Sequence, residues 1–175
     1  MKLKPFDGIT HGFTIEVDVK PNLSKFHITY NIHGPIETLE NTESGPLQKE
    51  PIEGLWKTTC FEFFCGPVFE THYMEWNFAA SGYWGNAYLE NYRKISHAHH
   101  SFVKPLEVNF QTPNKEELKV NVTLCLPNTL WAGKPLQGHC PVILDHGSGL
   151  LSYWAGKHPS GKPDFHARNF FDMKL

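Results

Sequence analysis

A loop close to the C-terminal end concentrates side chains that can bind a small polar molecule. Residues 156–166 contain two prolines, two glycines, two lysines, two histidines and one aspartate, and they follow the aromatic pair Tyr153 and Trp154. Proline fixes φ and glycine permits positive φ, so a loop of this composition has a specified shape. A shaped loop with many hydrogen-bonding groups beside aromatic rings is typical of a ligand site. The alternative is a well-packed closing turn.

Two carboxyl groups and an amide are expected to converge in the middle of the chain. As a strand, residues 73–78 place Glu75 and Asn77 on one face and three apolar side chains on the other. Glu62 alternates with phenylalanines in the same way. If the two strands are neighbours, these groups supply acceptors and donors suited to hydroxyl groups. Two alternatives remain: the carboxyls could be the acid pair of a glycoside hydrolase, or Glu62 could pair with Arg93 or a lysine.

Tryptophans stand close to these polar groups in the sequence, and Trp56 precedes Glu62 by six residues. An indole can cover the apolar face of a sugar ring while polar groups fix its orientation, although for any one tryptophan the alternative is a place in the core. We therefore expect non-catalytic binding of a carbohydrate or similar small polar ligand in an aromatic-lined site. The predicted ligand-binding residues are Trp56, Glu62, Asn77, Arg93, Trp154, His158, Lys162 and Asp164.

Other functions fit some of the same residues. An enzyme acting on a small polar substrate could use the paired carboxyls with His158 or His166 as acid and base. An interaction module could present an aromatic patch to another protein. The histidines at 97, 99 and 100 cluster, but their spacing matches no metal motif, so we predict no metal site.

Composition limits the classes of partner. The chain has 175 residues, which suits one domain spanning 1–175, and its 16 Lys and Arg against 18 Asp and Glu give a net charge of −2. This balance argues against nucleic-acid and membrane partners.

The N-terminal segment lacks the apolar core of a signal peptide, so we expect a soluble cytoplasmic protein, with a mature secreted form as the alternative. The four cysteines are expected to be free and mostly buried, and the oligomeric state is left open.

Alternating apolar and polar residues predict an all-β protein. The clearest strands cover 13–19, 26–32 and 118–126; shorter ones are expected near 58–64, 73–78, 108–111, 141–144, 152–155 and 170–175. Residues 89–95 could form a strand or a helical turn, and 34–54 are predicted to be a long loop. Clean alternation favours antiparallel pairing, so the expected architecture is an antiparallel β-sandwich of the jelly-roll kind.

Three blocks of sequence together resemble bacterial DOMON-like domain proteins, which are similar in turn to the family-nine carbohydrate-binding modules. The blocks are Leu55–Phe64, Tyr73–Gly82 with its continuation to Arg93, and Leu151–His166. The resemblance spans about residues 50–175. It implies an antiparallel β-sandwich that binds sugars or, in other DOMON branches, haem.

The resemblance also implies roles for particular residues. Family-nine modules hold the end of a glycan between two tryptophans, and the matching strands carry over Glu62, Asn77 and Arg93 as polar contacts. The candidates for the clamping indoles are Trp56, Trp84 and Trp154. These modules often hold calcium, but no acidic cluster here resembles a calcium loop. The haem branch uses a Met and His pair, whereas Met74 should face the core. We predict no cofactor, with calcium and haem as alternatives.

Overall fold

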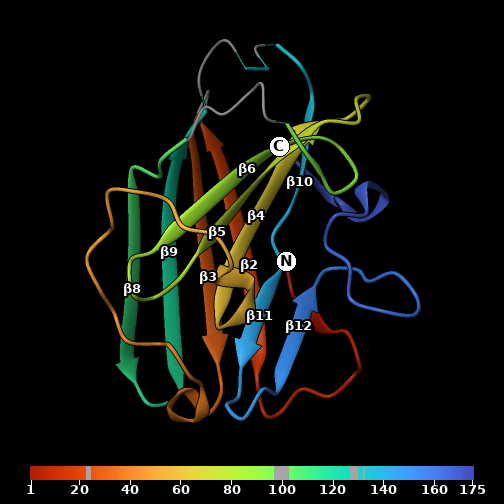
Figure 1. Ribbon diagram of the computed structural model, residues 1–175. Helices are drawn as coiled ribbons and strands as arrows, with labels where there is room; N and C mark the ends of the chain where they lie inside the picture. The colour runs from red at the N-terminus through yellow and green to blue at the C-terminus, as the bar shows by residue number, and fades with distance from the viewer. Residues whose placement is uncertain (23–24, 97–102, 127–129, 132) are drawn as a thin grey trace.

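The computed structural model describes residues 1–22, 25–96, 103–126, 130–131 and 133–175 (Figure 1). Two antiparallel sheets pack face to face, which confirms the predicted β-sandwich. The described residues contain 3-10 turns at Ile36–Thr38, Leu55–Lys57 and Arg168–Phe170 but no α-helix. Within this part of the chain, no helix has the length and apolar character that crossing a membrane would require.

The smaller sheet has four strands whose alternation sets one apolar and one polar face. Its order is β2 (Thr14–Asn22), β3 (Lys25–His33), β9 (Glu117–Cys125) and β8 (Glu107–Asn114). Ile28 and Val122 are directly opposite in the register and both are buried. On the outer face Thr29 donates a hydrogen bond to Asn121 at 3.0 Å. This sheet therefore matches the period-two prediction closely.

The larger sheet carries the sequence blocks that suggested a binding site. Its main path is β1 (Lys4–Pro5), β12 (Leu151–Ala155), β11 (Val142–Asp145), β4 (Cys60–Pro67), β5 (Tyr73–Phe78), β6 (Trp84–Asn91) and β7 (Lys94–Ile95). Two further strands, β10 (Leu136–His139) and β13 (Met173–Lys174), pair with each other, and β10 also pairs with β4.

Both faces of the larger sheet are covered at its centre, where every residue of β4 and β5 is buried. Phe63 and Trp76 stack in the core between the sheets, with ring centroids 5.7 Å apart. On the opposite face, a second apolar cluster joins sheet residues to Leu55 and to Phe165 and Phe171 of the C-terminal segment. The polar residues of β4 and β5 on this face therefore lie beneath loops, not on an open surface.

Several elements differ from the sequence-based expectation. Residues 84–91 form a strand, which settles the ambiguous stretch at 89–95, and the predicted strand at 170–175 shortens to Met173–Lys174 after a 3-10 turn. Strands β1 and β10 were not predicted, because a two-residue strand and the mixed segment Leu136–His139 show no alternation that a pattern can detect.

The cysteines and histidines give two smaller results. Cys60 and Cys65 lie on opposite faces of β4, as their odd spacing predicts, and Cys60, Cys65 and Cys140 are free and buried. The histidine cluster at 97, 99 and 100 lies outside the described residues.

Candidate functional site

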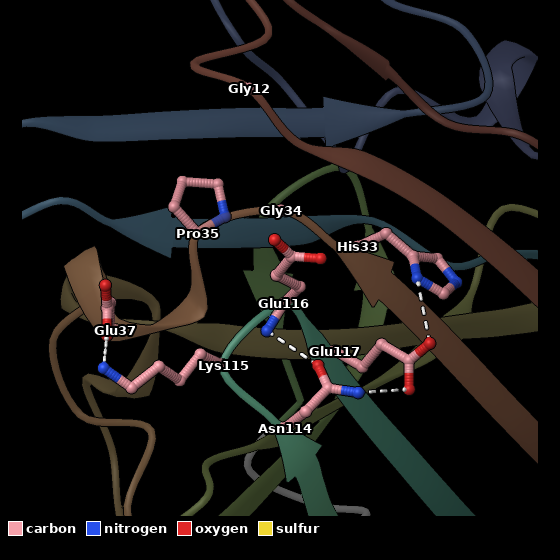
Figure 2. A pocket seen from close by; sticks show the side chains of 9 residues that line it. All are labelled: Gly12, His33, Gly34, Pro35, Glu37, Asn114, Lys115, Glu116 and Glu117. Atoms are coloured by element: carbon pink, nitrogen blue, oxygen red, sulfur yellow. Dashed lines mark hydrogen bonds and ion pairs between the residues drawn. The ribbon is translucent and has the colours of Figure 1, made fainter.

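One hollow of about 730 Å³ lies beside the turn between β8 and β9 (Figure 2). Four of its side chains already pair with one another: Lys115 with Glu37 at 2.7 Å, and His33 with Glu117 at 3.6 Å. The described residues that line it include no Phe, Tyr or Trp that could cover a sugar ring. None of the predicted ligand-binding residues lines this hollow.

A second cavity, of about 540 Å³, lies over the loop-covered face of the larger sheet. Its volume is in the usual range for small-molecule sites. Four of the eight predicted ligand-binding residues line it: Trp56, Glu62, Asn77 and Arg93. The other lining residues are Pro51, Ile52, Glu53, Glu75, Gly85, Asn86, Ala87, Leu89, Ile95, Ile143, Tyr153, Pro163, Phe165 and His166. The cavity thus combines a polar group of residues with apolar walls.

The polar floor follows from the register of two strands. Glu62 of β4 lies directly opposite Asn77 of β5, so their side chains share a face, as the sequence analysis expected. Asn77 Nδ2 donates to Glu75 Oε1 at 2.8 Å. From the other sheet, the Tyr30 hydroxyl donates to the backbone carbonyl of Glu62 at 2.6 Å and holds β4 in place. Strands β4 and β5 therefore contribute two carboxyls and one amide to a single cavity.

Burial dominates the electrostatics of this floor. Glu62 is 2% exposed and Glu75 9% exposed. Desolvation raises the pKa of Glu62 well above its usual value, the charge of Glu75 raises it further, and Arg93 opposes both. The pKa of Glu75 is also raised by burial, against the hydrogen bond from Asn77 and the charge of Arg93. The folded protein consequently favours the protonated form of this pair.

Replacing Glu62 with Gln should stabilise the protein at high pH. A carboxyl with a raised folded-state pKa contributes stability at low pH, and that contribution is lost as the pH rises through the folded-state value. Gln resembles the protonated acid and does not titrate. We expect the free energy of unfolding of E62Q to exceed that of wild type by about 1–3 kcal/mol at pH 8 and to show no such excess at pH 4. Urea denaturation at the two pH values measures this difference. A variant less stable than wild type at pH 8 would contradict this assignment.

Arg93 reaches the cavity from the turn between β6 and β7, where it adopts a positive φ of 54°. Its Nη2 donates to Asp164 Oδ1 at 3.1 Å, and the Tyr92 hydroxyl donates to Asp164 Oδ2 at 2.8 Å. The backbone N–H of His166 also donates to Asp164 Oδ1, at 3.0 Å. Asp164 therefore fastens the C-terminal loop to this turn and orients the guanidinium of Arg93.

Removing the Asp164 carboxylate should weaken binding at the cavity through Arg93. We expect D164A to lower affinity for a bound sugar about 5-fold and the free energy of unfolding by about 0.5–1 kcal/mol, measured by calorimetry and urea denaturation. D18A is the matched control, because Asp18 pairs with Lys20 at 3.4 Å on the other sheet. Equal affinity in D164A and D18A would show that Asp164 does not position Arg93 for binding.

Trp56 lies at the rim of the cavity in the turn Leu55–Lys57. Leu55 is buried beneath the turn, while Trp56 remains 46% exposed. Backbone hydrogen bonds from the preceding loop to β6 hold this rim, including Ile52 N–H to the carbonyl of Trp84 at 2.8 Å. Gly85 permits the close approach, since a Cβ there would clash with the carbonyl oxygen of Ile52. The indole of Trp56 is thus supported by the fold and available to a ligand.

The other candidate indoles do not reach the cavity. Trp154 is 1% exposed in the core between the sheets, where its Nε1 donates to Ser152 Oγ at 2.9 Å. Trp84 is also in that core, and its Nε1 donates to the carbonyl of Gln48 at 3.0 Å. The expectation that Trp154 lines the site is therefore corrected: the alternation of β12 turns Tyr153 toward the cavity and Trp154 away from it.

His158 and Lys162 also lie away from the cavity lining. His158 Nε2 lies 2.8 Å from the carbonyl oxygen of Lys4, and its ring contacts Phe6 edge-on at 5.5 Å. Lys162 is exposed and has no hydrogen bond or ion pair with another described residue. These two residues therefore belong to the closing turn that the sequence analysis gave as the alternative for this loop.

The binding-site prediction omitted Glu75, His166 and the apolar wall. Glu75 was expected to converge with Glu62 and Asn77 but was left out of the predicted ligand-binding residues, and His166 was considered only as a catalytic acid or base. His166 Nε2 lies 3.8 Å from Glu75 Oε2, and burial lowers the pKa of His166 to about 4. Tyr153 could have been found from its alternation with Trp154, whereas Ile143 and Phe165 carry no polar signal.

Comparisons with known proteins support the fold. No family model matches the sequence, and no curated protein matches it. Among solved structures, the chain is similar to a candidate carbohydrate-binding protein from Bacteroides uniformis, with a TM-score of 0.58, 16% identity and coverage of 96% of this chain and 83% of that one.

It is also similar to a family 9 carbohydrate-binding module from Caldicellulosiruptor kristjanssonii. The module in complex with cellotriose gives a TM-score of 0.53 at 8% identity, over 87% of this chain and 70% of that one. The glucose complex gives 0.50 at 8% identity, over 83% and 68%. At these identities the likeness shows the β-sandwich fold.

Proposed function

We propose that this domain binds a carbohydrate, or a small ligand of similar polarity, in the cavity between Trp56 and the floor of β4 and β5. The observation that carries the proposal is that Glu62, Glu75 and Asn77 line one cavity of about 540 Å³ with an exposed indole at its rim. The structural likeness to modules solved with glucose and cellotriose supports it. A DOMON-like relationship, suggested by sequence blocks, belongs to the same proposal.

The chemistry of the lining suits a sugar ring. Carboxyl and amide groups can accept and donate hydrogen bonds to ring hydroxyls, and the Arg93 guanidinium adds donors at the rim. Leu89, Ile143 and Phe165 provide apolar walls for C–H faces. Because the strands fix the floor and Asp164 fixes Arg93, most of the site is formed before a ligand arrives, which lowers the entropic cost of binding.

Calorimetric titration with a panel of mono- and disaccharides tests the proposal. We expect at least one to bind with a dissociation constant between micromolar and millimolar, at one site per chain. Failure of every sugar to bind at millimolar concentration would contradict the proposed function.

One arrangement also favours a second candidate, hydrolysis of a glycosidic bond. Glu62, Glu75 and His166 share the cavity, so two acids and a neutral imidazole could act on one substrate. Prolonged incubation with a panel of nitrophenyl glycosides distinguishes the two functions. Release of nitrophenol that disappears in E75Q would support catalysis. Sugar binding without any release of nitrophenol would support a binding function and contradict hydrolysis.

A further inference from the structure

The cavity contains more carboxyl groups than cationic groups among its described residues. Glu53, Glu62 and Glu75 line it with a single guanidinium, that of Arg93. That guanidinium already forms an ion pair with Asp164 at 3.1 Å and donates from Nε to the Tyr92 hydroxyl at 3.3 Å. His166 is neutral near pH 7, since its pKa is lowered to about 4. Among the described residues that line the cavity, the buried carboxyls therefore share their cation, Arg93, with Asp164.

Glu62 is the floor carboxyl that has no side-chain hydrogen bond to another described residue. Its carboxyl is almost fully buried and lines the cavity, yet no hydrogen-bond donor from the described residues pairs with it. Glu75 differs, because it accepts from Asn77 at 2.8 Å. A buried polar group without a partner costs free energy, and a charged one costs more. A ligand that places a donor against Glu62 removes this cost.

We propose that the natural ligand carries a protonated amine on a sugar ring, and that the amine sits against Glu62 and Glu75. The inference rests on the proposed sugar-binding function and specifies the class of sugar. An ammonium group supplies up to three donors and a charge, and hydrogen bonds between charged groups are roughly twice as strong as neutral ones. An ammonium group also favours the ionised form of the two carboxyls, which burial otherwise disfavours, and a neutral hydroxyl does not. The apolar wall and Trp56 remain available to the rest of the ring.

Calorimetry at pH 6, where an aliphatic amine is protonated, tests the proposal with glucosamine, glucose and N-acetylglucosamine. We expect glucosamine to bind at least about 10-fold more tightly than the two neutral sugars. In E62Q the ratio of glucosamine to glucose affinity should fall toward one, and E75Q should reduce it as well. E107Q is the matched control, because Glu107 is exposed on β8 of the other sheet and its removal changes the net charge equally.

The outcomes separate this inference from the proposed function. Glucose binding as tight as glucosamine would overturn the amine preference and leave sugar binding standing. A preference that persists unchanged in both E62Q and E75Q would also overturn it. Absence of binding by all three sugars would overturn both proposals. Cyclohexylamine, which has a ring and an amine but no hydroxyls, should bind far more weakly; equal affinity would show a cation site without sugar recognition and would contradict both.

Discussion

Replacing Trp56 with alanine should weaken sugar binding about 30–100-fold while leaving the fold intact. A tryptophan that packs against a ligand and loses its contact with water on binding is the kind of residue whose truncation costs about 2 kcal/mol or more in binding. Trp56 is 46% exposed, so its removal creates no cavity in the core. We therefore expect the free energy of unfolding to change by no more than about 0.5 kcal/mol. Calorimetric titration and urea denaturation of W56A measure the two effects separately.

Phe69 offers the control for this experiment. It is 89% exposed and does not line the cavity, so F69A removes a surface aromatic without touching the site. Sugar affinity should be unchanged in F69A. If W56A bound sugar as tightly as F69A does, Trp56 would have no part in recognition, and the rim of the proposed site would be misplaced.

Replacing Trp154 with alanine should have the opposite effect, with a large loss of stability. Trp154 is 1% exposed in the core between the sheets, and truncation of a buried tryptophan typically costs about 3–5 kcal/mol. Urea denaturation of W154A measures this loss. W154F should lose less, because it keeps most of the buried ring, and it should bind sugar like wild type. If W154F remained stable but lost sugar binding, Trp154 would contribute to ligand binding, which would contradict its assignment to the core.

The sequence predicts those parts of the fold that depend on local alternation. Residues 14–22, 25–33 and 117–125 each bury one face, and each was recognisable from period two alone. The same rule correctly placed Glu62 and Asn77 on one side of their strands, because β4 and β5 are neighbours in the sheet. Short strands such as Leu136–His139 depend instead on pairing with β4 and β13. Pairing with strands distant in the sequence cannot be predicted from a local pattern.

The site itself depends on contacts that are distant in the sequence. The loop after β12 covers the polar face because Asp164 binds Tyr92 and Arg93, and because His166 Nδ1 lies 2.8 Å from the Tyr73 hydroxyl. Those contacts bridge 71 to 93 residues of chain. Alternation shows that Tyr153 and Trp154 face opposite ways, but only the loop's position shows which of them meets a ligand. For this reason the sequence led us to expect Trp154 at the site, whereas the structure places Tyr153 there.

A crystal structure of the protein soaked with glucose and glucosamine tests the central claim most directly. We predict a single sugar in the cavity of about 540 Å³, with its ring against Trp56 and a hydroxyl or amine within hydrogen-bond distance of Glu62. A sugar bound elsewhere, with this cavity empty and accessible in the crystal, would contradict the account.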